Sequence, residues 1–298
     1  MHISRLLTCA GVFVSLTAAS AMQAQGYNRS AVVKYAAPLS GCTGGVSSVV
    51  STTAADVTCA DGLVLAQAHA SSANGRTSSY ASIVAQPGYV GDTWVASTRS
   101  IWYDVVTFGP ASPIPASMRL NAFFTGVLRA GFADPAGYES SGEIFLHFFA
   151  GDANGAQGAQ EKYTHLAARS APWIPGPQQV EQYYFEDFGF EIPIANTGAT
   201  TRAWFEQIID TDVAVGSPPS AVSSYGAYAT ADFSHTGVLY GLRFYDANHD
   251  DITDSVDYQF QYGTVLAATP TPEPDIAVLV ATGLLAVVGL ARRRAHRT

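Results

Sequence analysis

Hydrophobic and polar residues alternate with a period of two along most of this 298-residue chain, and long helical patterns are scarce. β-Branched and aromatic residues between turn-forming residues are typical of β-strands. The alternation predicts strands over 102–108, 118–128, 142–150, 180–194, 199–215 (one strand or two), 238–245 and 256–266. The apolar 142–150 segment is expected to be buried on both faces, and the last two strands to pair as a hairpin.

Loops rich in glycine and proline separate these strands, at 109–116, 152–160, 171–179 and 217–224. Many strands with such turns between them are typical of β-sandwiches and jelly rolls. We see no repeat of fixed period that would indicate a solenoid or propeller. We therefore predict an all-β chain with a single β-sandwich, jelly-roll-like domain over 25–268, flanked by an N-terminal signal peptide and a C-terminal transmembrane helix.

The first 24 residues have the three zones of a secretory signal peptide. Arg5 supplies the positive region and Leu6 to Ala19 the apolar region. Two small-residue cleavage sites follow, Ala19-Ser20-Ala21 and Met22-Gln23-Ala24, and the second lies just before Gln25. The apolar region is shorter than the ~20 residues of a membrane-crossing helix. An uncleaved anchor or a buried strand is the alternative interpretation.

A second targeting pattern occupies 269–298. Pro272-Glu273-Pro274 precedes an apolar run over 276–291, and Arg292-Arg293-Arg294 follows it. The run is long enough for a transmembrane helix if the flanking arginines reach the interface. Because arginine stays on the cytoplasmic side, the preceding domain is expected outside. A plain C-terminal membrane anchor is the alternative.

Together, Pro272, Glu273, Pro274, the apolar run and Arg292 to Arg294 resemble the PEP-CTERM sorting signal of Gram-negative bacteria that produce exopolysaccharide. The same tail is also described as an ice-binding protein C-terminal motif. The resemblance covers the tail alone, and Asp275 departs from the small polar residue more usual there. It implies passage through the inner membrane, cleavage by an exosortase, and delivery to the cell surface or the extracellular biofilm matrix.

The charge balance argues against nucleic acid as a partner. The chain has a net charge of −9, and five of its 15 basic residues lie in the two predicted signals. The domain between the signals is therefore more acidic still, whereas binding phosphates requires clustered Lys and Arg. Signal peptidase and exosortase are the partners that the two signals imply.

Two cysteines remain once the predicted signal peptide is removed, Cys42 and Cys59. Disulfides persist in the oxidising environment outside the cytoplasm. We therefore predict a Cys42–Cys59 disulfide. Two free thiols are the alternative, and a metal pair is disfavoured because no further ligand lies nearby at a suitable spacing.

No strong catalytic motif is present: we find no nucleophile elbow, no zinc-protease helix and no phosphate-binding glycine loop. Paired carboxylates could perform general acid and base chemistry on glycosidic bonds, although solvated surface acids are the simpler interpretation. His147 lies in an apolar strand and is interpreted as a core histidine. The candidate acidic groups are Glu139/Glu143, Glu181/Glu186/Glu191 and Asp210/Asp212, the last two on one side of a strand.

The segment from Asp246 to Asp257 spaces its oxygen-bearing side chains like a calcium loop. Asp251 stands where such loops need glycine, and the flanking sequences read as strands. An Asx-rich turn, whose side chains cap their own backbone, is the competing interpretation. The candidate Ca²⁺ ligands are Asp246, Asn248, Asp250, Asp254 and Asp257, and no other cofactor is expected.

The leading functional hypothesis is a non-enzymatic surface or matrix protein that engages exopolysaccharide, with Tyr225 and Tyr228 as candidate stacking residues. A secreted carbohydrate-active enzyme that uses paired carboxylates is the alternative. Ice binding is a third hypothesis, suggested by the tail alone, and the sequence contains no regular threonine array to support it.

Overall fold

The computed structural model describes residues 26–34, 42, 48–89, 93–109, 112–132, 139–152, 157–169, 178–194, 202–216, 226–234 and 237–267. They form strands β1 to β14 and a short 3-10 helix, η2 (Thr253–Ser255). Within these ranges no helix combines the length and apolarity needed to cross a membrane. The predicted signal peptide and the sorting tail, with Pro272, Glu273, Pro274 and Arg292 to Arg294, lie outside the described residues.

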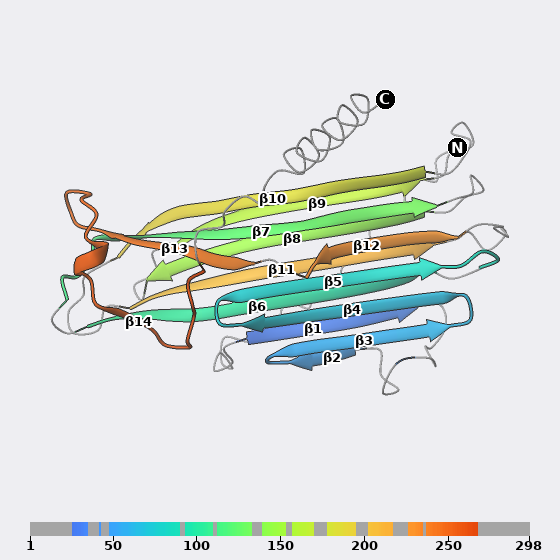
Figure 1. The fold of residues 1–298 in the computed structure, drawn as a ribbon, viewed down its shortest axis with the longest axis horizontal. Coiled ribbons are helices and arrows are strands. Elements are labelled where there is room, and N and C mark those ends of the chain that lie inside the picture. Colours follow the sequence, from blue (N-terminus) through green and yellow to red (C-terminus); the bar gives the residue numbers. More distant parts are fainter. Residues whose placement is uncertain are drawn as a thin grey trace, which may run out of the picture.

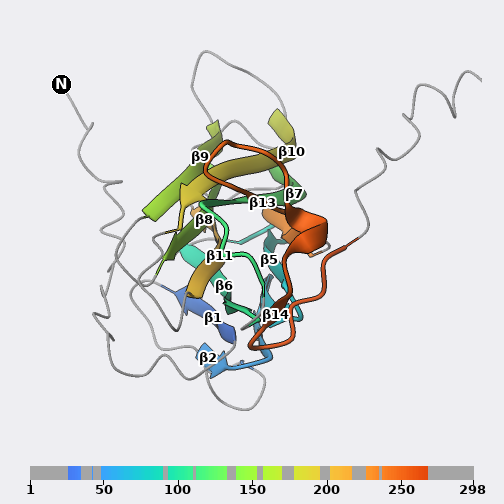
Figure 2. The same ribbon diagram turned by 90° about the vertical axis from the view of Figure 1, so that its left-hand side faces the viewer.

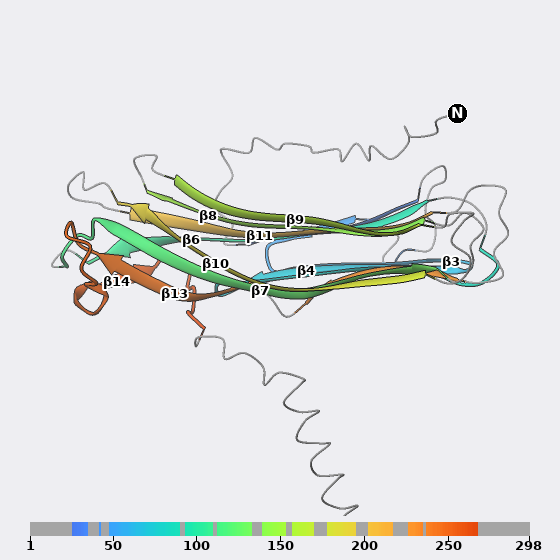
Figure 3. The same cartoon turned by 90° about the horizontal axis from the view of Figure 1, so that it is seen from above.

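Two antiparallel sheets pack face to face, which confirms the predicted all-β sandwich (Figure 3). Their strands run along the long axis of the molecule (Figure 1). Sheet A has the order β2 (Ser48–Ser51), β1 (Gly26–Lys34), β6 (Trp94–Phe108), β11 (Arg202–Gly216), β8 (Glu139–Asp152) and β9 (Gln157–Arg169), with β14 (Tyr258–Phe260) beside β6. Sheet B has the order β10 (Gln178–Pro193), β7 (Ser117–Phe132), β12 (Ala227–Phe233), β5 (Arg76–Ala85), β4 (Val64–Ala73) and β3 (Ala54–Asp61), and β13 (Val238–Tyr245) pairs with β5 and β7.

Local sequence explains how β4 and β5 form a tight hairpin. Asn74 and Gly75 connect the two strands, and both have a positive φ, of 51° and 82°. Two-residue hairpin turns of type I′ need positive φ at both positions, and Asn-Gly adopts it most readily. The alternation on either side then places Ala66, Ala68 and Ala70 between the sheets.

The interior changes character from one part of the sandwich to another. Large rings such as Phe148 and Phe205 fill the space between the sheets near β8 and β11. Near β5 and β6 the buried side chains carry hydroxyl groups instead: Thr211 is hydrogen-bonded to Ser79 at 2.9 Å and to Thr98 at 2.7 Å. Because Ser79, Thr98 and Thr211 are hydrogen-bonded to one another, their burial carries little desolvation cost, whereas the buried Thr77 hydroxyl of β5 has no partner among the described residues.

A strap over residues 261–267 ties the two sheets together. The carboxylate of Asp104, fully buried on β6, accepts hydrogen bonds from the backbone N–H groups of Tyr262 at 2.8 Å and Thr264 at 3.0 Å. Trp102 donates its indole N–H to the Thr264 hydroxyl at 2.8 Å. Beyond these residues, the N–H of Ala267 donates to the carbonyl of Leu239 in sheet B at 3.0 Å. The strap therefore fixes the end of the described chain to both sheets.

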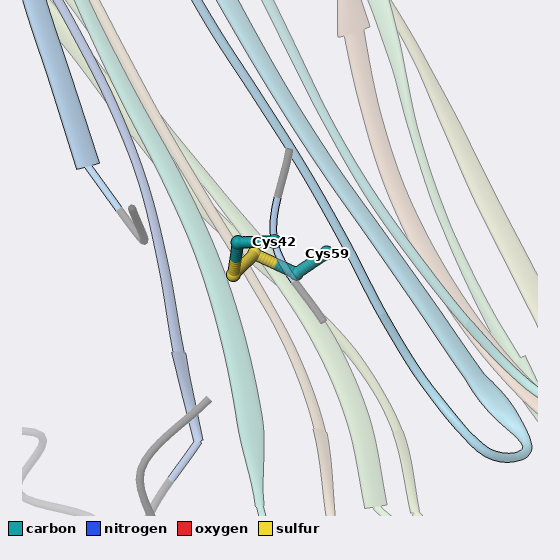
Figure 4. Close-up of a disulfide and its surroundings, with 2 residues drawn as sticks. All are labelled: Cys42 and Cys59. Carbon is teal, nitrogen blue, oxygen red and sulfur yellow. A yellow bond between two sulfur atoms is a disulfide. The ribbon is translucent and has the colours of Figure 1, made fainter. Parts of the chain in front are cut away.

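A disulfide joins Cys42 to Cys59 of β3, which confirms the predicted pairing (Figure 4). Cys59 is fully buried between the sheets, whereas Cys42 is half-buried. In the chain-entropy model, closing a loop of this length stabilises the fold by about 3 kcal/mol.

The predicted hairpin of 238–245 with 256–266 is wrong. β13 pairs with β7 in sheet B, whereas β14 pairs with β6 in sheet A. The segment between them crosses from one sheet to the other at one end of the sandwich (Figure 2). Alternation assigns the faces of a strand but does not identify its partner, which explains the error.

Two further expectations need correction at β8 and β9. The strand over 142–150 is not buried on both faces: its residues alternate between buried and half-buried, and His147 lies on the half-buried, outer side. The loop predicted over 152–160 includes the start of β9, which begins at Gln157. Gly158, Ala159 and Gln160 have weak strand preference, and pairing with β8 overrides it.

Candidate functional site

The outer face of sheet A gathers aromatic and charged side chains on neighbouring strands, and we call it the sheet A face. Strand alternation places these side chains outward because the intervening residues, such as Phe205, Gln207 and Ile209 of β11, point into the core. The aromatic members are Tyr103, Phe145, His147, Phe149, Tyr163 and Trp204. The charged members are Arg29, Arg99, Glu143, Glu161, Arg202, Glu206, Asp210 and Asp212.

The aromatic rings form two groups on this face. Across β8 and β9, His147 lies between Phe145 and Phe149, with ring centroids 3.5 and 4.9 Å away, and Tyr163 lies 6.4 Å from Phe145. Across β6 and β11, Tyr103 lies 6.2 Å from Trp204. Tyr163 is 57% exposed, so this edge of the face is open to solvent. Half-exposed rings of this kind offer flat apolar surfaces for stacking.

Carboxylates lie between and beside these two groups. Asp210 accepts two hydrogen bonds from Arg99, from Nε at 2.7 Å and from Nη2 at 2.6 Å, as a bidentate ion pair. That contact is the main reason why the pKa of Arg99 is raised. Two residues further along β11, Asp212 is opposite Glu143 of β8. Of the three acids Asp210, Asp212 and Glu143, Asp210 is therefore the one that Arg99 neutralises directly.

The pKa of Asp212 is raised to about 7. The largest cause is burial among the surrounding strands, although part of the residue reaches solvent, and the negative charges of Asp210 and Glu143 add to it. Both effects disfavour the charged form of a carboxyl group. Asp212 is therefore an acid that gains and loses its proton near neutral pH.

Glu206 occupies a more apolar position. In the register it is opposite Tyr103 of β6 on one side and Phe149 of β8 on the other. Burial raises its pKa, and the positive charge of Arg99 opposes that rise. This carboxyl group joins the two aromatic groups into one continuous surface.

His147 is a second titratable group held away from water. Burial lowers its pKa, and the Glu161 carboxylate, 3.6 Å from its Nε2, raises it less. This nitrogen is buried and has no hydrogen-bond partner within the described part of the chain. The face thus combines rings for stacking with carboxylates that accept hydrogen bonds.

The structure brings together only some of the acids that the sequence singles out. Glu143, Asp210 and Asp212 meet on the sheet A face. Glu181 and Glu191 lie on the outer side of β10 in sheet B, far along the strand from one another, and the side chain of Glu139 lies outside the described residues. The carboxylate pairs are therefore not equivalent, and among the described candidates only the β8–β11 group forms a cluster.

The tyrosines proposed for stacking do not lie on this face. Tyr228 belongs to β12 and lies on the outer side of sheet B, and Tyr225 is outside the described residues. The sequence interpretation missed Tyr103, Phe149, Trp204 and Glu206. The signal available was the outward set of β11, in which Trp204, Glu206, Asp210 and Asp212 share one parity.

The segment from Asp246 to Asp257 turns back on itself through its own carboxylates. Asp246 accepts hydrogen bonds from the N–H groups of Asn248 at 2.8 Å and Asp250 at 2.9 Å. The bond from Asp250 is the main cause of a lowered pKa at Asp246. Asp251 likewise accepts from the side chain and backbone of Thr253, which lower its pKa.

These contacts have the form of Asx turns, in which the side chain caps the backbone without a metal ion. Among the described residues, no group of three or more His, Cys, Asp or Glu side chains is placed to hold one. Calcium binding stays a prediction for Asp246, Asn248, Asp250, Asp254 and Asp257.

Comparison with known proteins supplies no function by analogy. No protein-family model matches the chain, and no curated protein is detectably similar to it.

Proposed function

We propose that this chain is the precursor of an exported, non-enzymatic surface or matrix protein that holds exopolysaccharide on the sheet A face. Exosortase processing at Pro272-Glu273-Pro274 would release or attach the folded sandwich outside the cell. The single observation that carries the binding role is the cluster of rings and carboxylates on one open sheet face. Flat, half-exposed rings stack on apolar surfaces, and neighbouring carboxylates orient a ligand by accepting hydrogen bonds.

One observation supports the export part of the proposal. The Cys42–Cys59 disulfide fits an oxidising compartment outside the cytoplasm. This observation does not depend on the resemblance of the tail.

The export route can be tested in an exosortase-bearing bacterium that secretes exopolysaccharide. We expect the product in the surface or matrix fraction, with a C-terminus near Pro274 by mass spectrometry. Glu273→Gln should leave uncleaved precursor in the inner membrane, whereas Asp275→Asn, a matched change of the next acid, should be processed normally. Recovery of wild-type protein with Arg294 still attached would contradict the sorting route.

The binding role needs a separate measurement. Affinity electrophoresis of the processed protein through gels containing the host exopolysaccharide should show retardation. A double variant, Tyr103→Ala with Phe149→Ala, should migrate freely. Equal migration of wild-type protein with and without polysaccharide would contradict the role.

A carbohydrate-active enzyme remains the second candidate, because one observation favours it. A general acid needs a raised pKa, and that of Asp212 is about 7, beside Glu143 on the adjacent strand. Release of reducing ends from the bound polysaccharide, abolished by Asp212→Asn, would establish the enzyme and replace the binding role.

A further inference from the structure

The sheet A face carries more carboxylate side chains than cationic ones. The described arginine side chains there are Arg29, Arg99 and Arg202, fewer than the five carboxylates of the face, and Arg99 is already engaged by Asp210. Asp212 and Glu206 form no ion pair with any other side chain in the described ranges. A ligand that covers this face must therefore meet uncompensated negative charge, because desolvating a carboxylate without a cation is costly.

The same positions are suited to a positive group for a second reason. Glu206 is opposite Tyr103 on one neighbouring strand and Phe149 on the other. A cation held at that carboxylate would also lie beside the faces of aromatic rings. Cation–π attraction contributes about 0.5–1 kcal/mol at exposed sites and more where water is excluded. Rings and carboxylates thus favour the same kind of ligand at the same place.

We propose that the sheet A face binds a polysaccharide with free amino groups, that is, a hexosamine polymer of which part is not acetylated. This inference rests on the proposed function, since it names the chemistry of the glycan held there. Sugar rings would stack on Tyr103, Trp204 and Phe149, while their ammonium groups would pair with Glu206 and Asp212. A polymer of uronic acids would instead place like charges together, which costs free energy.

The proton equilibrium of Asp212 gives a second, independent readout. An ammonium group close to Asp212 stabilises the ionised carboxylate and lowers its pKa from about 7. Binding should therefore release protons at about pH 5.5, where the sugar amines are already protonated and take up none. A neutral polymer has no charge with which to drive that release.

The experiment compares three oligosaccharides on the full-length chain in mild detergent: a de-N-acetylated glucosamine oligomer, its fully N-acetylated counterpart, and an oligo-uronate. Titration calorimetry at about pH 5.5, where the sugar amines are protonated, in two buffers of different ionisation enthalpy measures affinity and proton release together. We expect the free amine form to bind at least about tenfold more tightly than the acetylated form, with proton release, and the uronate not to bind.

Matched variants separate this face from the general acidity of the protein. Glu206→Gln combined with Asp212→Asn should reduce the preference for the free amine at least about fivefold, whereas Glu181→Gln on the outer side of sheet B should not change it. Equal binding of the amine and acetylated forms overturns this inference and leaves the proposed function standing. Absence of binding to all three oligomers and to the host polysaccharide overturns both, and an equal loss in Glu181→Gln overturns the assignment to this face.

Discussion

Acidic side chains on the outer faces of the two sheets have pKa values that are shifted in opposite directions. On sheet B, Glu181 takes a hydrogen bond from Arg129 Nε at 2.5 Å, and that contact lowers its pKa. On the sheet A face, burial raises the pKa of Glu206 and of Asp212. Glu181 is paired with an arginine, whereas Glu206 and Asp212 have no ion pair among the described residues.

The polar groups of sheet B also satisfy one another. On β4, β5 and β12 its outer side carries small hydroxyl residues, with Ser71 hydrogen-bonded to Ser78 at 2.6 Å and Ser82 to Thr230 at 3.2 Å. Cross-strand pairs of this kind stabilise a sheet. The fold therefore does not require the arrangement on sheet A, and local departures from what stability favours tend to mark functional sites.

Because the two faces differ, we expect aromatic side chains to contribute to oligosaccharide binding on the sheet A face and not on the outer face of sheet B. Phe149→Ala on the sheet A face should weaken oligosaccharide binding at least about tenfold, or about 1.4 kcal/mol. Phe185→Ala removes a ring that is 62% exposed on the outer side of sheet B and should have no effect. Calorimetric titration with the glucosamine oligomer checks both, and thermal melts confirm folding. Equal losses would mean that the two faces do not differ.

A smaller effect is expected when the arginine of each face is removed. Arg99→Gln leaves Asp210 without its bidentate partner, and only 16% of that side chain is exposed. We expect a loss of about 1 kcal/mol in the free energy of unfolding, near the low end for charged hydrogen bonds because solvent screens the arginine. Arg129→Gln should not differ measurably from wild type. Urea denaturation measures both, and an equal loss in the two variants would contradict the distinction.

Much of the fold could be predicted from alternation alone. Period-two patterning identifies β6, β7, β8, β10, β11 and β13, and the two cysteines outside the predicted signal peptide define the disulfide. The prediction did not include β1 to β5, β9 or β12. The same parity rule placed Asp210 and Asp212 on one side of β11. These features depend on residues close in sequence, or on few enough candidates to leave one choice.

The composition of the candidate site could not be predicted in the same way. Glu206 meets Tyr103 and Phe149 because β11 lies between β6 and β8, an order that does not follow the sequence. His147 was misassigned for a related reason: Phe145 and Phe149 share its outer side, so the run reads as buried on both faces. Strand order depends on long-range pairing, which local alternation does not encode.

Asp212 should make the stability of the protein fall as the pH rises towards neutrality. Its folded pKa of about 7 is above the 3.8 of the free side chain. Between these values the unfolded chain gives up the proton while the folded one keeps it, so stability is highest at the acidic end and is lost as the pH approaches 7. Asp212→Asn should flatten this decline in melting temperature between pH 4.5 and 7.5. An unchanged slope would show that Asp212 does not titrate abnormally.

His147 should produce the smallest effect, and in the opposite direction. Its folded pKa is lowered below the model-peptide value of 6.5, so the unfolded chain takes up a proton first as the pH falls. Stability from this group is therefore complete above about pH 6.5 and declines on acidification below it. His147→Gln should reduce that acid-side decline while leaving the Asp212-dependent slope intact. If the double variant with Asp212→Asn showed no flattening beyond Asp212→Asn alone, His147 would not be the second titrating group, and the sheet A face would differ from sheet B through its carboxylates only.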